Sequence, residues 1–218
     1  MEPKTVITTV LIVAALFSAG CTGGDGGQYG NQGGGNGGGS SITAIPAGSL
    51  NATEAADILY IREEEKLARD SYTYFYGLFR AQIFSNIAES EQTHMDAVAT
   101  LIDRYGLEDP ASPTAGAFAN ATLQAMYDQL TAEGSASETA ALAVAARIEE
   151  TDIVDLQMAT ARTDNADVRQ VYASLMQGSE NHLRAFVRNL GQWGVDYRPV
   201  VLFEEDYETI INGGTLSG

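Results

Sequence analysis

The chain has 218 residues, 44% of them hydrophobic, and its 29 acidic and 12 basic residues give a formal net charge of −17. So negative a chain repels phosphate backbones, which argues against nucleic-acid partners and favours cations. One cysteine and two histidines exclude a disulfide framework and a cysteine-based zinc site. A metal site would therefore have to use carboxylates and the two histidines.

The N-terminal segment has the features of an export signal. Residues 6–19 form a mostly apolar run of 14 residues, too short for a comfortable membrane span. Small residues stand directly before Cys21, as in the lipobox of secreted lipoproteins, which this stretch resembles. We expect a lipoprotein-type signal peptide over residues 1–20 and lipidation at Cys21; an uncleaved N-terminal anchor is the alternative. Either would hold the protein at the cell membrane, on its extracytoplasmic face.

A glycine-rich tract follows the signal segment. Between residues 22 and 41, 11 of 20 residues are glycine. Such a tract cannot bury a core, and we predict a flexible tether over residues 21–47. The globular domain is then expected over residues 48–218.

The first half of this domain predicts two long helices, because apolar residues recur at three- and four-residue spacing. The first is predicted over about 53–80, with Asn51 as N-cap and Glu54 completing a capping box. The second is predicted over about 81–105, ending at Gly106.

The second half predicts one short and two long helices. A short helix near 122–132 ends at Gly134, and Ser135 or Ser137 caps a long helix that reaches about residue 161. The last long helix runs over about 167–190, and an extended tail rich in β-forming residues follows it. Four long helices with a wide gap between the second and third predict an all-α four-helix bundle with a long crossover connection between helices 2 and 3.

The predicted inward faces contain charged residues at or beside positions that should be apolar. These residues are Glu65, Glu91, His94, Glu149 and His182. A buried, unpaired carboxylate costs several kcal/mol, so helices that turn such groups inward need a cation between them. A pair of divalent metal ions would supply that charge. Two alternatives stay open: the helices are misphased and these residues lie on the surface, or Arg62, Arg69 and Arg147 pair with them.

The same residues carry a resemblance to the rubrerythrins. Residues 91–94 form Glu-x-x-His, the motif with which di-iron bundle proteins offer a carboxylate and an imidazole to one metal pair. Residues 65–75 look like the first metal-binding helix of rubrerythrins, and residues 149–152 are similar to the Glu-x-Thr-Asp run of their third helix. Residues 182–186 resemble the histidine and aromatic residue of the fourth.

The chain therefore resembles the ferritin-like superfamily, and within it an uncharacterised archaeal and bacterial branch related to rubrerythrin. The resemblance implies two iron ions, with manganese as the alternative, bridged by Glu91. Glu65 would be a terminal ligand, and His94 and His182 would each bind one ion. The remaining ligands would be Glu149 and Glu180. Glu180 fits the helical phase least well, because residues two apart on a helix point about 200° apart.

The resemblance also implies a function. It suggests a membrane-tethered di-iron protein that reacts with oxygen or peroxide and takes electrons from a donor that the sequence does not identify. The lone Cys21 leaves no room for a rubredoxin-type iron with four cysteine ligands. The alternatives are a metal-binding or ferroxidase-like protein without mineral storage, and a non-catalytic helical interaction domain. Whether the protein is an enzyme stays open among them.

Overall fold

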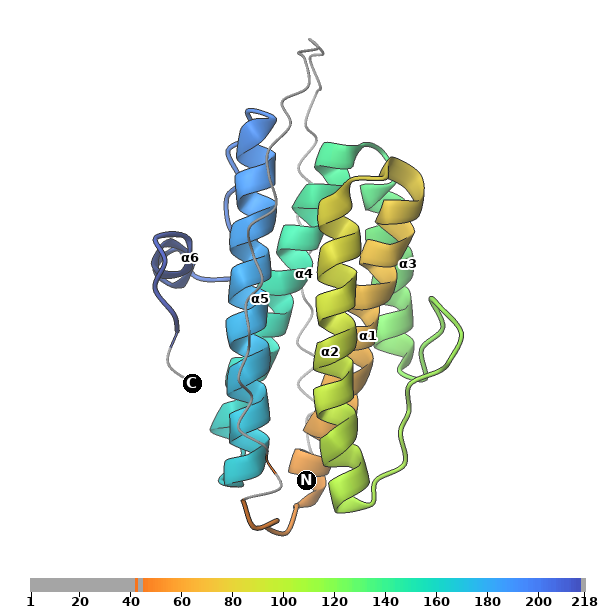
Figure 1. Cartoon of the computed structure of the whole chain (residues 1–218), viewed down its shortest axis with the longest axis vertical. Helices are drawn as coiled ribbons and strands as arrows, with labels where there is room; N and C mark the ends of the chain where they lie inside the picture. Colours follow the sequence, from red (N-terminus) through yellow and green to blue (C-terminus); the bar gives the residue numbers. More distant parts are fainter. Residues whose placement is uncertain (1–41, 43–44, 217–218) are drawn as a thin grey trace, which may run out of the picture. The chain divides into compact units, whose positions relative to one another are not determined.

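The computed structural model describes residue 42 and residues 45–216 (Figure 1). This described part consists of six helices and contains no strand. The expected signal peptide, Cys21 and most of the expected tether lie outside this part, so what we expect of them remains a prediction. In the part that is described, every helix is too short or too polar to cross a membrane.

Helix α1, Ala52–Phe79, begins as the sequence predicts. The side chain of Asn51 accepts hydrogen bonds from the backbone N–H groups of Thr53 and Glu54, and the Glu54 carboxylate accepts one from the N–H of Asn51. The predicted capping box is therefore confirmed. The helix ends at Arg80, whose left-handed backbone has a φ of 58°.

The other helices are α2 (Gln82–Tyr105), α3 (Ala121–Gly134), α4 (Glu138–Ala161), α5 (Ala166–Gln192) and α6 (Glu204–Ile211). The bounds of α1 to α5 agree with the predictions to within about two residues. Ser137 caps α4 by accepting the N–H of Ala140. Helix α6 is not predicted by the sequence pattern.

The long helices α1, α2, α4 and α5 form a closed ring of neighbours. Helix α1 contacts α2 and α4, and α5 contacts the same two helices (Figure 1). Part of their shared interior is a cluster of aromatic rings, in which the ring of Phe186 lies 5.2 Å from that of Tyr72 and 6.0 Å from that of Phe84. Helix α3 packs outside this ring against α1 and α4, and α6 packs against α5.

Helix α1 is covered on several sides, because α2, α3 and α4 all contact it. It consequently buries four consecutive polar residues, 63–66. Two of them hold the connection between α2 and α3. Glu63 accepts the backbone N–H of Asn120 at 2.9 Å, and the Lys66 ammonium donates to the carbonyl of Thr114 at 3.0 Å. Lys66 also pairs with the buried carboxylate of Asp70.

A buried carboxylate in α4 holds the chain that follows α5. Glu150 accepts hydrogen bonds from the hydroxyl of Tyr197 and from the backbone N–H groups of Val200, Val201 and Leu202. The segment predicted as an extended tail therefore lies against α4 before it leads into α6.

Candidate metal centre

The structure brings five of the six predicted ligands together between the long helices. Helix α1 contributes Glu65, α2 contributes Glu91 and His94, α4 contributes Glu149, and α5 contributes His182. They form two groups of three that share Glu91, and within each group the ligand atoms lie within 4.8 Å of one another.

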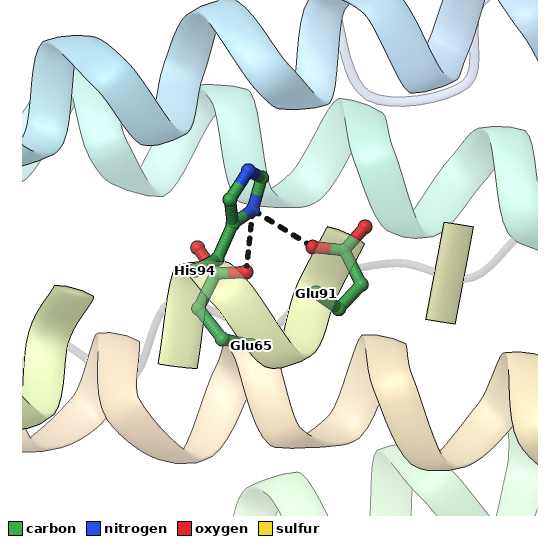
Figure 2. A group of neighbouring side chains, drawn as sticks. All are labelled: Glu65, Glu91 and His94. Carbon is green, nitrogen blue, oxygen red and sulfur yellow. Dashed lines mark hydrogen bonds and ion pairs between the residues drawn. The ribbon is translucent and has the colours of Figure 1, made fainter. Parts of the chain in front are cut away.

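The carboxylate of Glu91 lies between the two histidines. Figure 2 shows the first group, in which Nδ1 of His94 lies 2.8 Å from Oε2 of Glu91 and 3.2 Å from Oε2 of Glu65. In the second group, Nδ1 of His182 lies 2.7 Å from Oε1 of Glu91 and 3.6 Å from Oε2 of Glu149. Glu91 thus offers one oxygen to each imidazole. The two imidazole rings stack with their centroids 5.4 Å apart.

Local sequence explains how the histidines reach the site. Glu91 and His94 share a face of α2 because they are three residues apart. Helix α5 passes His94 at Gly178, where a Cβ atom would lie 2.3 Å from Nε2 of His94, so a larger residue here would displace the imidazole. Nε2 of His182 lies 2.9 Å from the hydroxyl of Ser90, which leaves Nδ1 of His182 facing the carboxylates.

Two further side chains support the centre from α1 and α5. The Tyr72 hydroxyl donates to Oε1 of Glu149 at 2.6 Å, and the Ser179 hydroxyl donates to Oδ2 of the buried Asp152 at 2.5 Å. Sequence reasoning gave Tyr72 no separate role at the centre. Its position two helical turns after Glu65, on the same face of α1, is the signal that could have suggested it.

The charges of the centre are strongly coupled. Burial raises the pKa of Glu65 and of Glu149 to about 7. Glu91 is buried too, but both histidines hold its pKa well below the ordinary value. Burial disfavours the imidazolium of His182, yet Glu91 and Glu149 raise its pKa to about 10, and the pKa of His94 is raised by Glu65 and Glu91. The imidazolium groups thus supply positive charge that a divalent ion would replace while displacing their protons.

The donor set fits a pair of divalent ions. Within residues 45–216, Oε1 of Glu65 is buried without a hydrogen-bond partner, and the 2.7 Å contact between Oε1 of Glu91 and Nδ1 of His182 lacks hydrogen-bond geometry. A metal ion would satisfy these atoms. Carboxylate oxygen and imidazole nitrogen together suit iron, manganese or zinc better than the softer metals that prefer sulfur.

The arginines considered as alternative partners of these carboxylates pair elsewhere. Arg62 pairs with Asp109, Arg69 pairs with Asp70, and Arg147 pairs with Glu133. The alternative that these residues lie on the surface of misphased helices is also not met, because the glutamates of the centre are each 1% exposed.

Glu180 is the predicted ligand that the structure does not bring to the centre. It is buried, but its Oε1 accepts the backbone N–H of Leu216 at 2.7 Å. The physical reason is the helical phase, since Glu180 and His182 lie on opposite flanks of α5. The two neighbours most easily confused with ligands also lie elsewhere: Glu150 holds residues 200–202, and Glu64 faces Asp155.

The part of the chain that the structure describes is all-helical, and three carboxylates and two imidazoles are buried among its long helices. The protein is thus of the all-helical class with a candidate metal centre in its interior. The chain belongs to the family described as "Uncharacterized protein domain (DUF2202)", whose model matches residues 54–214. All five residues of the centre lie within this match.

The chain is similar to a protein of Methanocaldococcus jannaschii named "Uncharacterized protein MJ0754". The two are 45% identical over 178 residues, which is 81% of this chain and 96% of that protein. The crystal structure of hypothetical protein MJ0754 from Methanococcus jannaschii matches this one with a TM-score of 0.77, over 79% of this chain and 99% of that chain.

Proposed function

We propose that this protein is a ferritin-like four-helix bundle that binds two divalent metal ions, iron foremost, and uses them to react with oxygen or peroxide. The observation that carries the proposal is the pair of ligand groups sharing Glu91. A shared carboxylate with one imidazole on either side is the arrangement expected for two neighbouring ions bridged by that carboxylate.

The residues around the centre have separate roles in this proposal. Glu65 and His94 would hold one ion, and Glu149 and His182 would hold the other, with Glu91 between them. The hydrogen bond from Tyr72 orients Glu149. Bound iron would supply the one-electron chemistry that reduction of oxygen or peroxide requires.

The burial of the centre limits the size of the substrate that can reach it. Its glutamates are 1% exposed and its histidines 8% exposed, so little room is left for a large organic molecule. Oxygen and peroxide are small enough to reach such a site. We propose that the electron donor is a separate molecule, and that the predicted lipid anchor at Cys21 holds the domain at the extracytoplasmic face of the cell membrane.

A second candidate function is the capture or oxidation of ferrous ions without storage. The net charge of −17 favours it, because a strongly negative surface concentrates cations near the protein. The remaining alternative, a non-catalytic interaction domain, would leave the buried carboxylates of the centre without the metal ions that fit them.

Metal analysis tests the proposal. The metal-free full-length chain, titrated anaerobically with ferrous ions, should bind two per chain. His94→Ala should lower the metal affinity by about 10–100-fold. Loss of a residue that only hydrogen-bonds to a metal ligand has an effect of this size, and loss of the ligand itself should cost at least as much. Glu180→Gln is the matched control, since it changes a buried carboxylate outside both groups.

The outcomes separate the candidates. Stoichiometry near zero removes the proposal and supports the interaction domain. Two bound ions that react on rapid mixing with oxygen or peroxide, and turn over with a reductant, support the redox protein. Oxidation of ferrous ions without turnover supports the second candidate.

A further inference from the structure

A pocket of about 410 Å³ opens between α1 and α4. Asp57 and Tyr60 of α1 and Asp155 and Arg162 of α4 are among the residues that line it. The guanidinium of Arg162 pairs with Asp57 through two contacts of 2.8 Å. Of the two carboxylates that line the pocket, Asp57 is paired with Arg162. The carboxylate of Asp155 therefore gives the pocket its acidic character.

Beneath the pocket lies another acidic side chain. Glu64 follows Tyr60 by one helical turn, is 3% exposed, and faces the carboxylate of Asp155. Apart from Asp155, neither oxygen of Glu64 has a hydrogen-bond partner among the described residues. The hydroxyl of Tyr60 donates to Asp155, which also has a hydrogen bond with Glu64. Glu64 and Asp155 are thus two facing carboxyl groups that either share a proton or could hold a cation between them.

A further buried carboxylate links this point to the metal centre. Asp152 lies one turn from Asp155 on α4, and its Oδ1 has no partner within the part of the chain that is described. Asp152 acts electrostatically on Glu65 and Glu149. Glu64 interacts electrostatically with Asp155, Asp152 and Glu65, so these carboxylates form a row from the pocket to the centre.

We infer that divalent cations reach the metal centre through this pocket, held in transit by Asp155 and Glu64 and passed by Asp152 to Glu65 and Glu149. The inference rests on the proposed function. Carboxylates that line a path with low-dielectric walls raise the local concentration of cations and the rate of their association. The row also accounts for two buried acidic side chains that no basic group of the described residues is shown to pair with.

The histidine side of the centre is the other approach. His94 and His182 are each 8% exposed there, and the flanking residues Ser90 and Gly178 carry no charge. Neither Ser90 nor Gly178 offers a carboxylate to attract cations. This side suits a neutral molecule, so metal and oxidant would reach the centre from different sides.

The rate of metal loading tests the route. The metal-free full-length chain is mixed rapidly with Co²⁺, whose visible absorption reports binding, and the final stoichiometry is measured separately. Glu64→Gln should slow loading by about tenfold, because it replaces one of the two facing carboxylates that would hold a cation in transit. Ala56→Phe should also slow it, because Ala56 is an exposed residue that lines the pocket. Both variants should still bind two ions at equilibrium.

A matched control and the outcomes make the test decisive. Ala52→Phe adds the same ring to an exposed residue of α1 that does not line the pocket, and it should load at the wild-type rate. Unchanged rates in both test variants overturn the route but leave the proposed function standing. Loss of an ion at equilibrium in Glu64→Gln overturns the transit role. Failure of the wild type to bind Co²⁺ overturns the proposed function itself. Ala56→Phe keeps the test decisive if Glu64→Gln does not fold.

Discussion

The absence of a side chain at Gly178 sets how closely α5 approaches His94. In Gly178→Ala, the new Cβ would lie 2.3 Å from Nε2 of His94, so the imidazole must move. We expect lower metal affinity although no ligand is removed, measured by metal titration. Gly77→Ala is the control, because its Cβ meets no atom within 4 Å, and it should stabilise the exposed helix position by about 0.5 kcal/mol. Equal affinities in the two variants would mean that the position of His94 does not matter.

Glu91 and Glu180 differ in what their carboxylates contact, and their amide variants should differ accordingly. Glu91 faces both histidines, so Glu91→Gln should lose both ions. Glu180 faces Leu216, so Glu180→Gln should keep them. Metal content of the purified variants distinguishes these results. Metal loss in both would show that Glu180 coordinates in solution.

Five residues of the candidate metal centre could be predicted from the sequence, whereas the residues that position them could not. Glu65 and His94 interrupt apolar stripes of regular period, and that interruption is visible along one helix. Gly178 and Ser90 matter because a different helix passes close by, which no period within a single helix encodes. The prediction of Glu180 as a ligand came from the resemblance to a family. Its position on α5, two residues before His182, turns its side chain away from the centre.

At the scale of elements, the start of α1 gives a prediction that depends on pH. The backbone N–H of Asn51 and the side chains of Thr163 and Asn165 lower the pKa of Glu54 below its ordinary 4.5. Because the pKa of Glu54 is lower in the folded chain than in the unfolded chain, its ionised carboxylate stabilises the fold at pH values above the unfolded-state pKa. This stabilisation is lost as the pH falls through the folded-state pKa.

Glu54→Gln should therefore lower the free energy of unfolding by about 1 kcal/mol at pH 7. The difference from the wild type should shrink once the pH is below the ordinary value of 4.5. Urea unfolding of both proteins at pH 7 and at low pH measures this. A difference that stays constant with pH would contradict the role of the ionised carboxylate.

Helix bounds were predictable because caps and glycines mark them, but two features of the elements were not. Helix α1 buries residues 63–66 together, since α3 and its connection cover a face that the amphipathic pattern leaves polar. Helix α6 has eight residues and buries Tyr207 and Ile210. So short a helix depends on contact with α5, and its own sequence carries little signal.

At the scale of the whole molecule, the predicted lipid anchor would decide where the domain works. Cys21→Ser should release the protein from membranes or leave its precursor unprocessed, because lipid attachment needs the thiol. Fractionation of cells followed by immunoblotting measures both position and size. A variant that is processed and still sediments with membranes would show that another feature holds the protein there.

The anchoring of the last segment by Glu150 has a consequence for the order of synthesis. Its partners lie 47 to 52 residues further along the chain. When α4 leaves the ribosome, these donors do not yet exist, and a buried carboxylate without donors is costly. We expect α4 to reach its final packing only after residue 202 has been made. Glu149, the proposed metal ligand beside Glu150, is therefore among the last parts of the candidate metal centre to be fixed in place.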